Sequence, residues 1–427
     1  MKVLMFGWEF PPHISGGLGT ACAGITDGLA ANDVQVIFVV PRHYGNEDTK
    51  SIRLISAGDT PVHDEKAISG RLKRMLVRYE INSPLTPYIN AAQFRTETVS
   101  EDAAQDPMQL ASPIRYAFSG GYGKDLMKEV WQYAITAEVI AKEQSFDIIH
   151  ANDWLTFPAA ILASEASGKP LVVHVHATEF DRSGTNINTQ VYETERLGMQ
   201  KADHIIAVSE FTRQIIITRY HIPAEKISVV HNGVAWDNRT TVKKSDRVFR
   251  EPTVVFAGRI TYQKGPAAFV EAAARILKTN SNFRFIMAGS GDLMHDMINR
   301  AAQLRISSHF HFTGFLHKQE LEKLLSQADV YVMPSVSEPF GISPLEAVSN
   351  GVPVVISRQS GVQEVLQHAL KMDHWDLDAL ANNIYGLASY KGISRLLSRE
   401  SRREVDALTW EKQSGLILHI YQSILNH

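Results

Sequence analysis

The chain has 427 residues, of which 44% are hydrophobic and 21% are charged. This composition is typical of globular proteins, and the length predicts two or three domains. The formal net charge of −3 lacks the basic excess of a general polyanion binder, so nucleic acid is a poor candidate partner. The single cysteine, Cys22, excludes an internal disulfide framework and a cysteine-rich metal site.

The first residues, Met1–Gly7, contain an apolar run that is too short for a secretory signal. No run approaches the ~18–20 apolar residues that are needed to span a bilayer. We therefore expect a cytoplasmic protein without an integral membrane segment. The sequence does not predict an oligomeric state.

In the first half of the chain, short β-branched runs alternate with longer stretches of helical periodicity, which indicates a parallel α/β fold. Two helices are predicted, from Ala21 to Ala31 and from Leu126 to Lys142. Prolines interrupt the pattern in residues 42–125, where we assign no regular elements. The predicted strands are Val3–Phe6, Val34–Val39, Ile148–His150, Leu171–His174, His204–Val208 and Ile227–Val230.

The second half repeats this alternation after a charged segment, residues 237–250, that has the composition of an interdomain linker. Its predicted strands are Thr253–Ala257, Phe283–Ala288, Phe310–Phe312, Val330–Met333 and Val354–Ile356. The fold class is therefore α/β, with two Rossmann-like doubly wound domains and an interdomain cleft. We place the domains at residues 1–240 and 251–405. Ligands of such sheets lie outside the carboxyl ends of the strands.

The segment after the strand Val330–Met333 runs from Glu338 to Glu346 and reads Glu-Pro-Phe-Gly-Ile-Ser-Pro-Leu-Glu. One interpretation is local, because Ser343 and Glu346 have the spacing of a capping box at a helix N-terminus. The other is functional. Free amides at Gly341–Ser343 would bind an anion, and a carboxylate such as Glu338 suits sugar or ribose diols. The segment alone leaves both interpretations open.

A second motif favours the functional interpretation. After the strand Thr253–Ala257 the chain reads Gly-Arg-Ile-Thr-Tyr-Gln-Lys-Gly, which places Arg259 and Lys264 five residues apart. Solvated surface charge is the alternative for this pair. However, an arginine fork and a lysine point charge are a suitable clamp for a diphosphate.

A glycine pair, Gly16-Gly17, lies between the first strand and first helix and could bring amides to a phosphate, although it matches no dinucleotide fingerprint or P-loop.

Taken together, these segments resemble the family-4 retaining glycosyltransferases of the GT-B fold, and within them the archaeal-type glycogen and starch synthases. The likeness covers nearly the whole chain. Its N-terminal motifs are Lys2–Pro12, Gly16–Gly19, His150–Trp154, His176–Arg182, Ala207–Ser209 and His231–Val234, and they are followed by the C-terminal segments around Arg259, Thr313 and Glu338.

The resemblance implies a role for each matching residue in the binding of a nucleotide-sugar donor. Glu338 would contact the sugar hydroxyls, Glu346 the ribose, and Arg259 with Lys264 the diphosphate. His176 would border the sugar, and with Arg259, Lys264 and Glu338 it forms the predicted catalytic set. The remaining predicted donor-binding residues are Gly16, Gly17, Thr313, Gly314, Phe315, Leu316, Phe340, Gly341, Ile342 and Ser343.

Three further residues, Asp153, Asp181 and Arg182, are candidates for the acceptor side, with helix capping, packing or a local ion pair as their structural alternatives. The family likeness also implies that the last segment, residues 406–427, is a helix that crosses back to the N-terminal domain. One position departs from the family, because Ser15 stands where ADP-glucose-dependent bacterial glycogen synthases carry lysine. The preference for ADP-glucose is therefore open.

We predict that no metal or cofactor is required. The chain has one Asp-x-Asp motif, Asp376-Leu-Asp378, and it precedes a helical pattern at Ala379–Ala388 as an N-cap would. Arg259, Lys264 and the Gly341–Ser343 amides would stabilise the leaving diphosphate instead. The family mechanism is attack on the same face of the sugar, with retention of configuration.

The predicted reaction is transfer of glucose from ADP- or UDP-glucose to an α-glucan, as in glycogen synthases. A sugar-nucleotide epimerase shares the two-domain plan, but it would release a rearranged sugar without an acceptor. Two further alternatives are open. One is another family-4 glycosyltransferase with a small-sugar or lipid-linked acceptor, and the other is a non-catalytic glycan- or nucleotide-sugar-binding module.

Overall fold

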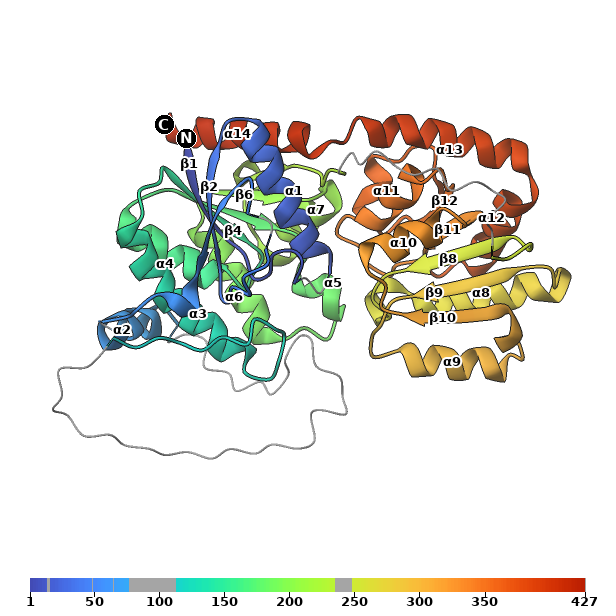
Figure 1. Cartoon of the computed structure of the whole chain (residues 1–427), viewed down its shortest axis with the longest axis horizontal. Coiled ribbons are helices and arrows are strands. Elements are labelled where there is room, and N and C mark those ends of the chain that lie inside the picture. Colours follow the sequence, from blue (N-terminus) through green and yellow to red (C-terminus); the bar gives the residue numbers. More distant parts are fainter. Residues whose placement is uncertain (14–15, 48, 64, 77–112, 235–247, 427) are drawn as a thin grey trace. The chain divides into compact units, whose positions relative to one another are not determined.

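The computed structural model describes residues 1–13, 16–47, 49–63, 65–76, 113–234 and 248–426 (Figure 1). It divides into two compact units. The first contains Met1–Ala207, Arg213–Val230 and Glu411–His427, and the second contains Val208–Thr212 and His231–Trp410. Most of the predicted linker, residues 237–247, lies outside the described residues.

The first unit is built on a parallel sheet with the strand order β3-β2-β1-β4-β5-β6-β7. Its strands are β1 (Lys2–Phe6), β2 (Gln35–Val40), β3 (Arg53–Ser56), β4 (Ile148–Asn152), β5 (Leu171–Val175), β6 (His204–Ala207) and β7 (Ile227–Val229). Its helices are α1 (Gly17–Ala31), α2 (Glu65–Leu76), α3 (Leu126–Glu143), α4 (Phe157–Ser167), α5 (Glu179–Ser183), α6 (Thr189–Lys201), α7 (Glu210–Tyr220) and α14 (Trp410–Leu425). Helix α7 begins in the second unit and continues in the first.

Helices cover both faces of this sheet (Figure 1), and its central strands are apolar on both sides for that reason. In β1, Val3 to Phe6 are fully buried. The last helix, α14, belongs to this unit although it is the last element in the sequence. The Ser414 hydroxyl donates to the carbonyl of Ile25 in α1, and Asn32 donates to the carbonyl of Glu411.

The second unit has a parallel sheet with the order β10-β9-β8-β11-β12-β13. Its strands are β8 (Thr253–Ala257), β9 (Arg284–Ala288), β10 (Phe310–Gly314), β11 (Val330–Met333), β12 (Val354–Ser357) and β13 (Leu370–Met372). Its helices are α8 (Pro266–Thr279), α9 (Met294–Gln303), α10 (Lys318–Leu325), α11 (Ile342–Ser349), α12 (Leu377–Ser389) and α13 (Lys391–Asp406).

The predicted fold class, two parallel α/β Rossmann-like domains, is confirmed. In both sheets the chain reverses its direction of winding beside the first strand, between β1 and β4 and between β8 and β11. Loops at such switch points are the usual ligand-binding positions of doubly wound sheets. In the described part of the chain, no helix is both long enough and apolar enough to cross a membrane.

Candidate active site

In the second unit, the two predicted donor-binding motifs lie on neighbouring loops at the switch point. The loop after β8 carries Lys264, and the loop after β11 carries Glu338. The two loops are joined by a main-chain hydrogen bond in which the amide of Val336 donates to the carbonyl of Gln263 at 2.9 Å. The parallel sheet therefore brings together two motifs that are more than 70 residues apart in the sequence.

Lys264 and Glu338 form an ion pair across these loops. The Glu338 side chain is 7% exposed and that of Lys264 20% exposed. The Ser335 hydroxyl also donates to the same Glu338 carboxylate oxygen, Oε2, at 3.3 Å. The Glu338 carboxylate is therefore held at the carboxyl end of the sheet by one partner on each of the two loops. Sequence reasoning did not identify Ser335 as part of this cluster.

Gly265 allows the two loops to approach each other. Its φ is +64°, and a Cβ built on it would lie 2.1 Å from the Pro334 carbonyl oxygen. We expect the free energy of unfolding of Gly265→Ala to be at least about 2 kcal/mol lower than that of the wild type. The left-handed backbone alone costs ~1–2 kcal/mol for a residue with a Cβ, and the clash adds to this cost. Gly351→Ala is the matched control, since Gly351 has φ +77° and no atom within 4 Å of a Cβ.

Urea denaturation of both variants measures the difference. The control should lose only the cost of the left-handed backbone, and Gly265→Ala should lose clearly more. Equal losses would show that Gly265 is required for its φ alone and that the close approach to Pro334 is easily relieved.

The predicted capping box at Ser343 and Glu346 is wrong. Helix α11 begins at Ile342 and its N-cap is Gly341, with no side-chain cap. The reason is the turn before the helix, where Gly341 has φ +102° and a Cβ would lie 3.1 Å from the Met333 sulfur. Only glycine adopts this conformation at low cost, so the chain enters the helix two residues earlier than predicted. The Gly341–Ser343 amides still lie at the start of the helix, where first-turn N–H groups have no intrahelical acceptor.

The other predicted donor-binding residues of this unit lie around the same edge of the sheet. Arg259 is exposed after β8, and Glu346 is partly buried in α11. Phe340 is buried, with its ring centroid 5.6 Å from that of His231. The segment Thr313–Leu316 spans the end of β10, where Gly314 has φ +71° and its carbonyl accepts from the amide of Gly289. Phe315 in that segment is 57% exposed.

In the first unit, the predicted glycine turn begins α1. Gly16 is its N-cap and Gly17 its first residue. Ile14 and Ser15 lie outside the described residues. A residue that sequence reasoning missed, Glu9, occupies part of this helix start, because its buried carboxylate accepts from the Gly19 amide at 3.0 Å and from the Tyr122 hydroxyl at 3.2 Å. Its position just before the glycine-rich turn is the signal that was available.

Asp153 and His176 lie together at the ends of β4 and β5. The Asp153 carboxylate accepts from the main-chain amides of His176 at 2.6 Å and Ala177 at 3.2 Å. Burial raises the pKa of Asp153 to about 6. The charge of Arg182 and the two amide hydrogen bonds oppose this rise. The proposed capping role for Asp153 is wrong, since the N-cap of α4 is Thr156. Asp153 instead fixes the loop that carries His176.

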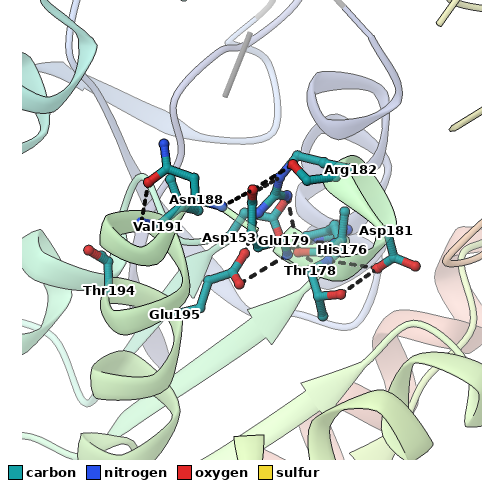
Figure 2. Close-up of polar contacts among 12 residues, drawn as sticks. Asp153, His176, Thr178, Glu179, Asp181, Arg182, Asn188, Val191, Thr194 and Glu195 are labelled. Atoms are coloured by element: carbon teal, nitrogen blue, oxygen red, sulfur yellow. Dashed lines mark hydrogen bonds and ion pairs between the residues drawn. The ribbon is translucent and has the colours of Figure 1, made fainter. Parts of the chain in front are cut away.

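Asp181 and Arg182 belong to a buried polar network around α5 (Figure 2). Asp181 completes a capping box with Thr178. Arg182 forms ion pairs with Glu179, at 3.2 Å, and with Glu195 of α6. Burial raises the pKa of Glu195 to about 7, and the Arg182 charge opposes that shift. Glu195 gave no sequence signal, because it reads as one more charged residue in a helix with other charges.

Among the described residues, no group of three or more histidine, cysteine, aspartate or glutamate side chains is arranged to hold a metal ion. Metal independence stays a prediction. Asp376 is the N-cap of α12 and accepts from the Ala379 amide at 2.9 Å, as predicted. His150 and His174 are buried in the sheet.

Two protein-family models match adjoining parts of the chain. Residues 103–238 match the model described as Glycosyltransferase Family 4, and residues 237–384 match Glycosyl transferases group 1. An uncharacterized glycosyltransferase from Methanocaldococcus jannaschii is 26% identical to this chain, and the alignment covers 99% of this chain and 98% of the relative. A glycogen synthase from Mycobacterium tuberculosis is 25% identical over the same share and covered to 94%.

Solved structures show the same architecture. A sucrose-phosphate synthase from Thermosynechococcus elongatus aligns with a TM-score of 0.73 at 18% identity, over 100% of this chain and 99% of its own. Anabaena HepE in complex with UDP and glucose aligns with a TM-score of 0.66 at 16% identity, over 99% and 100% of the two chains. Fold and family matches define a glycosyltransferase of the GT-B class. The two matched regions adjoin, with the family 4 region at residues 103–238 and the group 1 region at residues 237–384.

Proposed function

We propose that this protein is a retaining, metal-independent hexosyltransferase that transfers glucose from ADP- or UDP-glucose to an α-glucan, in the manner of archaeal-type glycogen synthases. The observation that carries the proposal is the Lys264–Glu338 pair on adjacent switch-point loops. It joins a cation suited to a diphosphate with a carboxylate suited to sugar hydroxyls. A cytoplasmic location is part of the proposal and rests on the sequence alone.

In this scheme, the donor lies along the carboxyl edge of the second sheet. Its diphosphate contacts Lys264 and Arg259, and the Gly341–Ser343 amides bind a phosphate oxygen at the start of α11. The interaction of each of these groups with the leaving diphosphate becomes more favourable as negative charge develops on it. Such stronger binding of the transition state is the condition for catalysis. Glu346 binds the ribose, and Thr313–Leu316 binds the nucleobase.

Glu338 orients the sugar by accepting hydrogen bonds from its hydroxyls. Residues of the first unit complete the proposal. The Gly16-Gly17 turn contributes a phosphate contact, His176 borders the sugar, and Asp153, Asp181 and Arg182 lie on the acceptor side. Attack occurs on the same face as departure, and the leaving phosphate takes the proton of the acceptor. No general base is assigned.

The experiment is a donor and acceptor matrix, in which ADP-, UDP- and GDP-glucose are incubated with glycogen, maltooligosaccharides, small sugars and lipid-linked glycans. Release of nucleoside diphosphate that depends on an α-glucan supports the proposal. Turnover only with a small or lipid-linked acceptor would assign the chain to another family-4 activity. Binding of donor without turnover on any acceptor would leave the non-catalytic alternative.

We expect transfer to persist after treatment with a chelator. After incubation with excess EDTA and dialysis, the protein should keep at least about half of its initial transfer rate. Protein cations and amides take the place of a metal at the diphosphate. The same treatment of a metal-dependent glycosyltransferase serves as the positive control. Loss of activity that Mg²⁺ or Mn²⁺ restores would contradict metal independence while leaving the donor assignment intact.

A further inference from the structure

Asn152 occupies a position from which it can determine the hydrogen-bonding state of His176. Asn152 is the last residue of β4, and it pairs in register with His174 of β5. His176 follows the end of β5 by one residue. Its ring nitrogen Nε2 lies 3.1 Å from Oδ1 of Asn152. The two side chains therefore meet at the carboxyl edge of the first sheet, beside the switch point.

The orientation of the Asn152 amide follows from its second contact. Its other terminal atom lies 3.0 Å from the main-chain carbonyl oxygen of Phe6. A carbonyl can only accept, so the atom that faces Phe6 is the amide nitrogen, Nδ2. The atom that faces His176 is then the oxygen, which also can only accept. Nε2 of His176 must therefore carry the hydrogen.

The surroundings of His176 keep its ring neutral. Its ring stacks on that of His174 at a centroid distance of 4.2 Å, and His174 lies 5.3 Å from His150. Burial, with a smaller contribution from His150, lowers the pKa of His176 to about 3. The nearby carboxylate, Asp153, bonds the main-chain amide of His176 rather than its ring.

A neutral imidazole with its hydrogen on Nε2 has a bare lone pair on Nδ1. This atom is buried and has no hydrogen-bond partner among the described residues. Leaving such a group unpaired costs about 1–3 kcal/mol, so the site gains this free energy when a donor group reaches the atom. A hydroxyl, which is the donor that sugars carry, has the chemistry that this atom lacks.

We propose that Asn152 is a positioning residue, which holds His176 as the Nε2–H tautomer and thereby makes Nδ1 an acceptor for a sugar hydroxyl. This inference rests on the proposed function for the identity of the ligand, and on the hydrogen bonds alone for the tautomer. It explains why an asparagine ends β4. An aspartate in its place would stabilise the charged ring, and an apolar residue would leave the tautomer unselected.

The tautomer is measured directly by long-range ¹H–¹⁵N NMR of the full chain with ¹⁵N-labelled histidine, which distinguishes protonated from bare ring nitrogens. His176→Gln identifies the resonances. We expect a neutral His176 with the hydrogen on Nε2 throughout pH 6–8. In Asn152→Asp the ring should protonate at a higher pH than in the wild type, and the rate–pH profile should gain an acid limb.

Asn152→Leu removes the acceptor and should lower kcat/KM by about tenfold, the scale of one hydrogen bond. The control is Ser228→Ala, which removes the hydroxyl 2.8 Å from Nε2 of another histidine, His204, in the same sheet. It should change neither the His176 spectrum nor the rate. A wild-type His176 with its hydrogen on Nδ1 would overturn the inference. So would an Asn152→Leu variant that keeps the wild-type tautomer and rate. Because the NMR result needs no turnover, failure of the proposed function would be seen separately.

Discussion

Lys264→Ala is expected to lower kcat at least about 100-fold, the scale of one lost electrostatic stabiliser. Lys264 is the cation that the structure places beside Glu338, between the two loops at the switch point. Its charge interacts with a diphosphate more strongly after bond cleavage than before it, so the loss should appear in kcat rather than only in KM. Steady-state kinetics with the best donor of the matrix measures the effect.

Two controls separate catalysis from folding. Lys278→Ala removes an exposed lysine from the far end of the helix that follows the same loop, and it should leave kcat within about twofold. The paired variant Lys264→Met/Glu338→Gln removes both charges, so it should recover stability that Lys264→Ala loses by leaving Glu338 buried without its cation, without recovering activity. Wild-type kcat in Lys264→Ala would refute the diphosphate clamp.

Arg182→Met is expected to destabilise the protein by about 3–5 kcal/mol, because it leaves carboxylates buried without their cation. The side chains of Glu179 and Glu195 are 0% and 1% exposed, and that of Arg182 is 6% exposed. The matched control is Arg300→Met. Its ion pair with Glu271 is 43% and 30% exposed, and such pairs contribute less than about 1 kcal/mol.

The loss should grow with pH. The Arg182 charge opposes the upward shift of the Glu195 pKa, so its removal raises the folded-state pKa above about 7. A carboxyl whose pKa is raised in the folded state contributes stability at low pH and loses it as the pH rises from its unfolded value through the folded one. Urea denaturation at pH 5 and pH 8 should therefore show a larger deficit at pH 8. A deficit below about 1 kcal/mol at both values would contradict the account of this network.

Elements with strong local patterns were predicted well. The strands Thr253–Ala257 and Val330–Met333 match β8 and β11 residue for residue, because buried parallel strands read as continuous apolar runs. Two edge strands, β3 and β13, were missed. They are three or four residues long and include Arg53 and Lys371, so neither length nor apolarity distinguishes them from loops.

Only part of the candidate site could be predicted, because local sequence patterns do not show tertiary contacts. Arg259, Lys264 and Glu338 follow strand ends, and the topology of a doubly wound sheet brings such ends together. The start of α11 was misplaced, because the left-handed Gly341, with φ +102°, is the N-cap and lies two residues before the Ser343 that the capping pattern indicated. Likewise, Glu195 and Asn152 depend on which side chains the neighbouring strands and helices place beside them.

The anomeric configuration of the first product tests the proposed retaining transfer most directly. An α-configured nucleotide-glucose is incubated with the protein and the acceptor that supports turnover, and the new linkage is followed by ¹H NMR from the start of the reaction. Retaining, metal-independent transfer predicts an α-linked product whose formation is lost in Lys264→Ala and unaffected by EDTA. A β-linked first product, or a rearranged sugar released without an acceptor, would contradict it.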